Sequence, residues 1–197
     1  MDTPVSRSQG KAQFTDVQTL REKARKHVME GAVTDSYGAD RKKVIELLQA
    51  ALATEIVCVL RYRQNHFAAR GLRAKIAAAE FLEHSKQEQE HADQIAGRIV
   101  QLGGDPDLDP ATLEGRSHAE YRIGATLAEM IRENLVAERI AIESYREIAE
   151  YVGKNDPTTR RLMEAILAVE EEHADDLADL LVDCAGASGA AGASCPT

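Results

Sequence analysis

The chain has 197 residues, of which 44% are hydrophobic and 29% are charged, so its length and composition indicate one globular domain with appendages. Aromatic residues make up only 4% and Trp is absent, which favours long packed helices and argues against an all-β sandwich. The net charge of −9 at pH 7 disfavours binding to nucleic acid over the whole surface and suits cations.

The sequence carries no sign of a membrane or secretory context. No stretch approaches the roughly 18 continuous apolar residues that a membrane span needs, and the first residues lack the apolar core of a signal peptide. Three Cys without a C-x-x-C pair give neither a disulfide framework nor a zinc site. We therefore expect a cytoplasmic protein that does not associate with a membrane.

The chain divides into a polar arm, a helical domain and a tail. Residues 1–39 are mixed and polar and are expected to form an N-terminal arm with a possible short helix near 14–30. The pattern changes at Asp40, a plausible N-cap, and the helical domain is expected over 40–184. Residues 185–197 are rich in Ala, Gly and Ser and are expected to be a disordered tail.

Four long helices are predicted in this domain from capping residues and glycines. Their expected ranges are about 41–69, 73–102, 120–152 and 157–183. Short turns join the first two helices and the last two, so each pair must be antiparallel, whereas residues 103–119 are long enough to run the length of a bundle. The predicted fold is therefore all-α, a four-helix bundle with one long crossover between the second and third helices.

Ionisable residues interrupt the apolar stripe of every predicted helix. The second and fourth helices each carry a Glu and a His three residues apart in the middle of the stripe, and the first and third helices each carry one Glu there. These residues are Glu55, Glu88, His91, Glu138, Glu170 and His173. The offset from Glu55 to Glu88 is 33 residues and that from Glu138 to Glu170 is 32, which returns the chain to the same level of each hairpin. All six side chains are therefore predicted to meet at mid-bundle.

Electrostatics restricts what such a cluster can be. Four bare carboxylates in an apolar core would repel one another, and the burial of each costs several kcal/mol without a partner. Two divalent metal ions would neutralise the four negative charges, and the two imidazoles would complete the coordination. Carboxylate and imidazole ligands without thiolate suit iron or manganese, with zinc possible.

Individual residues of the pattern can also be explained without a metal site. One Glu-x-x-His motif in a Glu-rich helix also fits a solvated face, but two motifs with matching partners favour a site. Tyr62 and Tyr145, each seven residues after the single Glu of its helix, are either core residues or neighbours of the metals. His84, one turn before Glu88, is expected to be a partly exposed residue rather than an accessory ligand.

The combined pattern Glu55…Tyr62…Glu88-x-x-His91…Glu138…Glu170-x-x-His173 resembles the ferritin-like superfamily over about residues 41–183, and bacterioferritin most closely. The resemblance implies an iron storage and detoxification protein, a ferroxidase active against oxidative stress, that oxidises Fe(II) with O2 or H2O2 and collects ferric mineral in a hollow shell. It implies two iron ions per subunit. Glu55 and His91 would bind one ion and Glu138 and His173 the other, while Glu88 and Glu170 would bridge them and Tyr62 would lie close by.

Two departures from bacterioferritin modify these expectations. The family's haem is bound by a Met directly after the second-helix Glu, and this chain has Gln89 there, so no haem is predicted. The tail has no pattern for a fifth helix, and the crossover is long, with a possible small helix at about 110–121. Both features resemble the 12-subunit Dps-like mini-ferritins, so a homo-oligomeric dodecamer is favoured over a 24-mer.

Alternative functions also follow from the residues. The same metal site would serve a di-metal oxidase or manganese catalase that stores no metal. A Dps-type DNA-protecting shell is a further alternative, but the net charge makes DNA binding unlikely. The last alternative is a metal-free bundle whose carboxylates are protonated.

Overall fold

The computed structural model describes residues 14–72 and 74–189, and the side chains of these residues as far as Cys184. The chain divides into two units, residues 1–36 and 37–197. In the first unit, α1 (Val17–Lys23) begins at Asp16, whose carboxylate accepts a hydrogen bond from the Thr19 backbone N–H at 3.0 Å. A 3₁₀ turn (Val28–Glu30) follows. The helical stretch expected near 14–30 is therefore interrupted, because His27 adopts a left-handed conformation with φ 50°.

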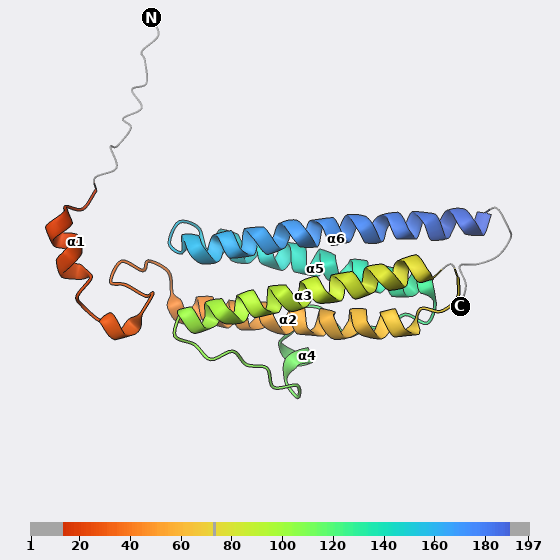
Figure 1. The fold of residues 1–197 in the computed structure, drawn as a ribbon, viewed down its shortest axis with the longest axis horizontal. Helices are drawn as coiled ribbons and strands as arrows, with labels where there is room; N and C mark the ends of the chain where they lie inside the picture. The colour runs from red at the N-terminus through yellow and green to blue at the C-terminus, as the bar shows by residue number, and fades with distance from the viewer. Residues whose placement is uncertain (1–13, 73, 190–197) are drawn as a thin grey trace, which may run out of the picture. The chain divides into compact units, whose positions relative to one another are not determined.

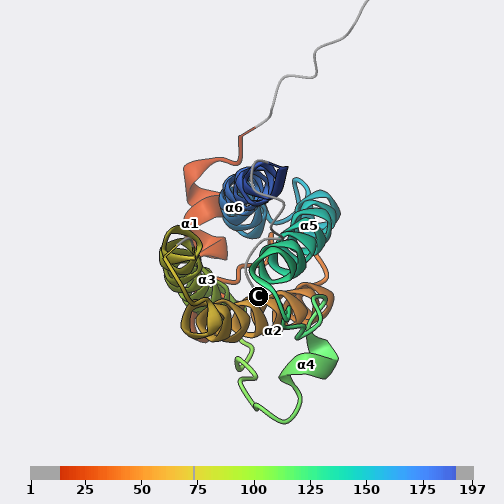
Figure 2. The ribbon, with the colours of Figure 1, turned by 90° about the vertical axis from the view of Figure 1, so that its right-hand side faces the viewer.

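The second unit is a four-helix bundle. Its long helices are α2 (Arg41–Ala68), α3 (Lys75–Gln101), α5 (Leu127–Val152) and α6 (Pro157–Gly189). Figure 1 shows the hairpins α2–α3 and α5–α6 side by side, and Figure 2 shows the four helices around a common interior. The described residues contain no strand. The fold class predicted from the sequence, an all-α bundle with one long crossover, is confirmed.

Capping side chains define where the helices begin. The Asp40 carboxylate accepts from the Lys43 backbone N–H at 3.1 Å at the start of α2, as predicted. The Asp156 carboxylate does the same for Thr159 at 2.9 Å at the start of α6. The α5–α6 turn follows Gly153, whose φ of +47° is a conformation that glycine adopts without strain.

The third long helix begins at Leu127, seven residues later than the sequence prediction of 120. Thr126 and Glu129 form a capping box, which stops the helix from extending toward its N-terminus. At Gly124 a Cβ atom would lie 2.3 Å from the Met130 backbone nitrogen, so the chain approaches α5 too closely for any other residue.

The crossover between α3 and α5 runs along α2. It contains one short helix, α4 (Leu113–Arg116), which packs against α2 and is shorter than the segment expected at 110–121. The buried Arg61 guanidinium donates to the Glu120 carbonyl at 2.9 Å, to the Glu133 carbonyl at 3.0 Å and to Asn134 Oδ1 at 3.1 Å. One α2 side chain thus fixes the crossover and α5 together.

The end of α6 also differs from the sequence prediction. The helix was expected to stop near residue 183 and a disordered tail to follow, but it continues to Gly189. Ala is the strongest helix former, so Ala185 and Ala187 sustain the helix past Gly186. The rest of the expected tail, residues 190–197, lies outside the described residues.

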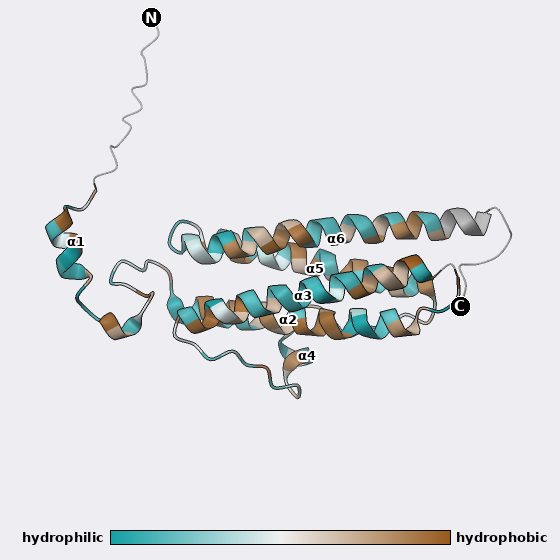
Figure 3. Cartoon of the chain, in the orientation of Figure 1, coloured by the Kyte–Doolittle hydropathy of each residue, from teal (hydrophilic) through white to brown (hydrophobic). Residues whose placement is uncertain are grey.

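Hydrophobic residues fill the bundle above and below its middle. Figure 3 shows hydrophobic and hydrophilic residues alternating along the four helices, as expected when each helix turns one face inward. The largest buried apolar side chains are Leu48, Leu52, Phe81, Ile95, Ile99, Leu102, Ile131, Met163 and Ile166. Among residues 14–72 and 74–189, no helix combines the length and apolar composition that crossing a membrane requires.

Candidate metal centre

The middle of the bundle is charged. The structure brings together the six side chains singled out in the sequence, one Glu each from α2 and α5 and a Glu–His pair each from α3 and α6. None of the six is more than 5% exposed. Because α-helical residues three apart share a face, each Glu-x-x-His pair points both donors at one place.

The six residues form two overlapping groups of potential metal ligands. One group is Glu55, Glu88, His91 and Glu170, and the other is Glu88, Glu138, Glu170 and His173. In each group the ligand atoms lie within 4.8 Å of one another. Glu88 and Glu170 belong to both groups, so the geometry contains two positions that share two carboxylates.

The shared carboxylates turn one oxygen toward each histidine. Glu170 Oε1 lies 2.9 Å from His91 Nδ1, and Glu170 Oε2 lies 3.2 Å from His173 Nδ1. Glu88 Oε2 lies 3.8 Å from His91 Nδ1, and Glu88 Oε1 lies 3.2 Å from His173 Nδ1. Ligands about 2.1 Å from one ion are about 3.0–3.4 Å apart, so three of these four distances fit common coordination.

The unshared carboxylates each belong to one histidine. Glu55 Oε2 lies 3.5 Å from His91 Nδ1, and Glu138 Oε1 lies 4.0 Å from His173 Nδ1. Each is also held by a tyrosine from the opposite hairpin: Tyr145 donates to Glu55 Oε1 at 2.5 Å, and Tyr62 donates to Glu138 Oε1. Burial and the neighbouring carboxylates raise the pKa of both phenols well above the usual value, so they act as donors.

Several potential metal-ligand atoms in the cluster make no hydrogen bond. They are Glu55 Oε2, Glu88 Oε1, His91 Nδ1, Glu138 Oε2 and Glu170 Oε1, all buried. Buried polar atoms in proteins are normally satisfied, and this concentration of unsatisfied oxygens is what a bound cation would relieve. The donor set of four carboxylates and two imidazoles therefore fits two divalent ions.

The pKa values of the clustered side chains also indicate that positive charge stabilises the cluster. Burial, followed by the charges of Glu88 and Glu170, raises the pKa of Glu55 and Glu138 well above the usual value. Burial alone would lower the pKa of His91, but the carboxylates beside it raise it to about 12. Burial would also lower the pKa of His173. The carboxylates of Glu170 and Glu88 outweigh this effect and raise the pKa to about 9. Protons thus supply the cluster's positive charge when no metal is bound.

Two residues around the cluster were not identified as site residues from the sequence. Gln87 Oε1 accepts from His173 Nε2 at 2.8 Å, which leaves His173 Nδ1 free to face the carboxylates. His84 was expected to be partly exposed, and this is wrong, because it is 1% exposed and its ring stacks on His173 at 4.0 Å. Burial, together with the charge of His173, lowers the pKa of His84 to about 3. The position of His84 on the same inward stripe as Glu88 indicated its burial. The sequence prediction discounted this position because the equivalent residue of the other hairpin is the apolar Ile166.

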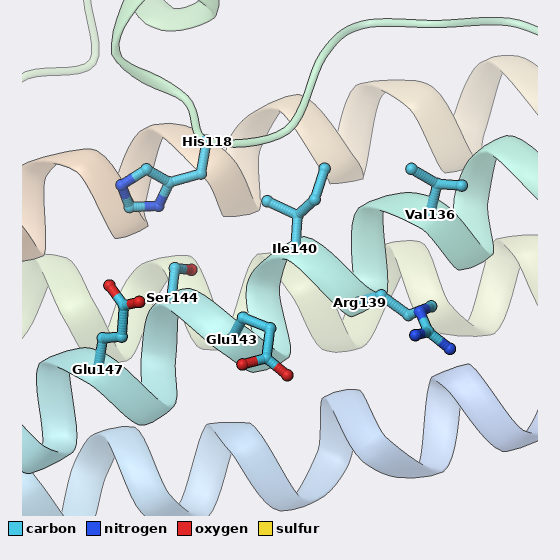
Figure 4. Close-up of a pocket in the computed structure, with 7 residues that line it drawn as sticks. All are labelled: His118, Val136, Arg139, Ile140, Glu143, Ser144 and Glu147. Atoms are coloured by element: carbon cyan, nitrogen blue, oxygen red, sulfur yellow. The ribbon is translucent and has the colours of Figure 1, made fainter.

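A separate pocket of about 520 Å³ lies between the crossover and α5. Figure 4 shows His118 from the crossover above Ile140, Ser144 and Glu147 of α5. Burial lowers the pKa of His118, against the opposing charge of Glu147. None of the six clustered residues lines this pocket, so it is distinct from the candidate metal centre.

Known proteins share the helical domain of this chain. A family model described as a ferritin-like domain matches residues 45–187. Bacterioferritin from Rhodobacter capsulatus is 35% identical over 142 residues, which cover 68% of this chain and 80% of that protein. A DNA protection during starvation protein from Pyrococcus furiosus is 34% identical over 142 residues, covering 69% and 75% of the two chains.

Solved structures agree with the sequence comparison. A bacterioferritin-related protein from Bacteroides fragilis, described as a dodecameric thioferritin, superimposes with a TM-score of 0.75 at 34% identity, over 78% of this chain and 93% of that chain. The bacterioferritin of R. capsulatus gives a TM-score of 0.62 at 30% identity, over 72% and 84%. With this fold, this family match and these relatives, the chain belongs to the ferritin-like family.

Proposed function

We propose that the chain is an iron storage and detoxification protein with ferroxidase activity at the centre of its own bundle. The observation that carries this proposal is the pair of overlapping ligand groups that share Glu88 and Glu170. Two Fe(II) ions are the substrate. Glu55 and His91 bind one ion, Glu138 and His173 bind the other, and the shared carboxylates bridge them.

The reaction needs two electrons, one from each Fe(II). The pair reduces H2O2 with two protons to two molecules of water, or O2 with two protons to H2O2. Hard carboxylate oxygens favour the ferric product over Fe(II), because they stabilise higher positive charge. The chain's part is to hold both ions together in a site from which bulk water is largely excluded.

Protons must leave the cluster when iron enters. The raised pKa values of Glu55, Glu138, His91 and His173 indicate that these groups carry protons in the metal-free protein. Metal ligands bind in their deprotonated forms, so Fe(II) displaces these protons. Tyr62 and Tyr145 keep their own protons and orient Glu138 and Glu55, which makes them positioning residues.

Ferric mineral then collects in a hollow shell of identical subunits, for which we propose a dodecamer. The similar protein from B. fragilis is described as dodecameric. Exposed apolar side chains on the bundle helices supply surface for contacts between copies, among them Leu60, Phe67, Val136 and Tyr151. Light scattering of the assembled protein, with and without Fe(II), measures the mass; a stable monomer contradicts storage.

The test of the centre is rapid oxidation of anaerobically added Fe(II) after mixing with O2 or H2O2. Wild-type protein should oxidise Fe(II) in a fast phase that saturates at two ions per chain. Glu88→Ala removes a shared ligand and should abolish this phase, whereas Glu90→Ala, an exposed residue two positions away, should keep it. Equal rates in Glu88→Ala and wild type would contradict the site.

A DNA-protecting shell is the second candidate, because one relative is named a DNA protection during starvation protein. The net charge of −9 opposes it. A gel shift at physiological salt distinguishes the two functions. A catalase that stores no metal would release O2 from H2O2 and form no mineral. Electron microscopy of iron-loaded protein would show whether mineral is present.

A further inference from the structure

A second cluster of metal-ligand types lies beside the dinuclear centre and uses none of its six residues. It consists of Glu80 and His84 on α3 and Asp176 on α6. His84 Nε2 lies 3.3 Å from Glu80 Oε1 and 3.6 Å from Asp176 Oδ2. Ligands about 2.1 Å from a tetrahedral ion are separated by about 3.4 Å, so these two distances match a single coordination sphere.

The buried end of this cluster is unsatisfied. His84 is 1% exposed, and its Nε2 atom makes no hydrogen bond. The two carboxylates are side chains that are 36% and 55% exposed, so the cluster opens to solvent on one side. In the part of the chain that the structure describes, no Lys or Arg pairs with Glu80 or Asp176. The two negative charges therefore face each other across the unpartnered imidazole nitrogen.

Hydrogen-bond direction assigns the lone pair of His84. The single phenolic proton of Tyr62 is donated to Glu138, and His84 Nδ1 lies 3.2 Å from the same phenolic oxygen. Since the phenol has no second proton to give, the ring N–H of His84 must be on Nδ1 and donate to that oxygen. Nε2 then carries a lone pair directed at two carboxylate oxygens. Three acceptors converge with no proton among them, which is an arrangement that a cation stabilises.

We infer that Glu80, His84 and Asp176 form a third cation site, which takes one divalent transition-metal ion through one imidazole nitrogen and two carboxylate oxygens. This donor set suits Fe(II), Mn(II), Co(II) and Zn(II). Solvent supplies the remaining ligands, because both carboxylates are partly exposed. The site is adjacent to the dinuclear centre, since the ring of His84 stacks on that of His173 at 4.0 Å.

The position of the site deepens the proposed function, on which this part of the inference rests. The third site lies between solvent and His173, so it would bind an Fe(II) ion before that ion enters the dinuclear centre. At low Fe(II) concentration, loss of the third site should slow the filling of the centre. At saturating Fe(II) concentration, the oxidation rate should stay unchanged.

Metal binding to the assembled, metal-free protein tests the inference without any oxidation. Equilibrium dialysis against Co(II) measures bound ions per chain at matched free concentrations. Glu80→Gln and Asp176→Asn, both conservative changes at partly exposed positions, should each lose one Co(II) per chain relative to wild type. Glu83→Gln, on an exposed side chain of the same helix, should lose none.

A dinuclear-site variant separates this inference from the proposed function. Glu88→Ala should lose two Co(II) per chain and keep the third, whereas combining it with Asp176→Asn should lose all three. If Glu88→Ala oxidises Fe(II) normally while Asp176→Asn still loses one Co(II), the proposed function fails and the third site stands. If Glu80→Gln and Asp176→Asn bind as much Co(II) as wild type, the third site is refuted.

Zn(II)-soaked crystals give a direct readout of position. Anomalous scattering at the zinc edge should show a peak about 2.0–2.1 Å from His84 Nε2 and about 2.0–2.2 Å from oxygens of Glu80 and Asp176. Crystals that show zinc in the dinuclear centre but no peak at His84 would overturn the inference. They would mean that His84 binds the two carboxylates as an imidazolium instead.

Discussion

The two tyrosines of the centre differ by one contact, which makes their matched substitutions a quantitative test. Both phenols are fully buried and each donates to one glutamate. Tyr62 also accepts from His84 Nδ1. Tyr145→Phe therefore leaves one buried group without a partner, and Tyr62→Phe leaves two.

The structure converts this difference into an expected change in thermal stability. A buried polar group left unsatisfied costs about 2 kcal/mol, the middle of the usual range. One kcal/mol lowers the Tm of a chain of this size by roughly 2–4 °C. Tyr145→Phe should thus lower the Tm by roughly 4–8 °C, and Tyr62→Phe, at about 4 kcal/mol, by roughly 8–16 °C.

Thermal unfolding of the metal-free protein, followed by circular dichroism at one protein concentration, measures both shifts. Because both side chains lie inside the bundle, contributions from contacts between subunits are the same for the two variants. Tyr121→Phe is the control, since this crossover tyrosine is 39% exposed, and its Tm should equal that of wild type. An equal loss for Tyr62→Phe and Tyr145→Phe would refute the contact between Tyr62 and His84.

Other consequences can be measured separately. Zn(II) at about 100 times its dissociation constant should stabilise the metal-free protein by about 2.7 kcal/mol, seen as a higher Tm that EDTA reverses; an unchanged Tm would count against the centre. The pKa values of His91 (about 12) and His173 (about 9) lie above the unfolded value of 6.5, so protonation of both histidines contributes its full stability to the fold below pH 6.5. The contribution of His173 is lost as the pH rises through 9. The urea midpoint of metal-free protein should fall between pH 6.5 and 9, and a rising midpoint would contradict the protonated cluster. Asp156→Asn leaves the buried Arg98 guanidinium without the carboxylate it contacts at 2.9 and 3.0 Å, and should cost about 3 kcal/mol in urea unfolding; a loss below about 1 kcal/mol would mean that the pair is not buried in solution. Purified protein should show no Soret absorption, because this chain has Gln89, whose amide donates to Asp93, where the resemblance to bacterioferritin calls for a haem-binding Met; a Soret band would contradict this.

Helical periodicity accounts for most of what the sequence predicted. Capping residues and glycines located the four long helices, and the stripe spacing placed four Glu and two His on their inward faces; the structure has all six within one cluster. That inference succeeds because side-chain direction in a straight helix follows from residue number alone. Caps of strong propensity, such as Asp40 and Asp156, identified two helix starts for the same local reason.

The start of α5 and the burial of His84 were mispredicted. The start of α5 is determined by the approach of Gly124 to Met130 and by the Thr126–Glu129 capping box, and the sequence prediction of a start at 120 used neither. The burial of His84 depends on its stacking against His173, a residue of another helix 89 positions away. Sequence spacing within α3 contains no information about that neighbour.

The crossed tyrosine–glutamate bonds mean that neither half of the bundle is complete alone. Each hairpin supplies a phenol to the other's carboxylate, so a protein made of two separate copies of one hairpin, related by a twofold axis, would present the same donors and both phenol contacts. Splitting this chain within its crossover and mixing the fragments should therefore regenerate the centre by complementation. His84 breaks this internal symmetry, because its counterpart on α6 is Ile166, and it makes the two halves chemically unequal.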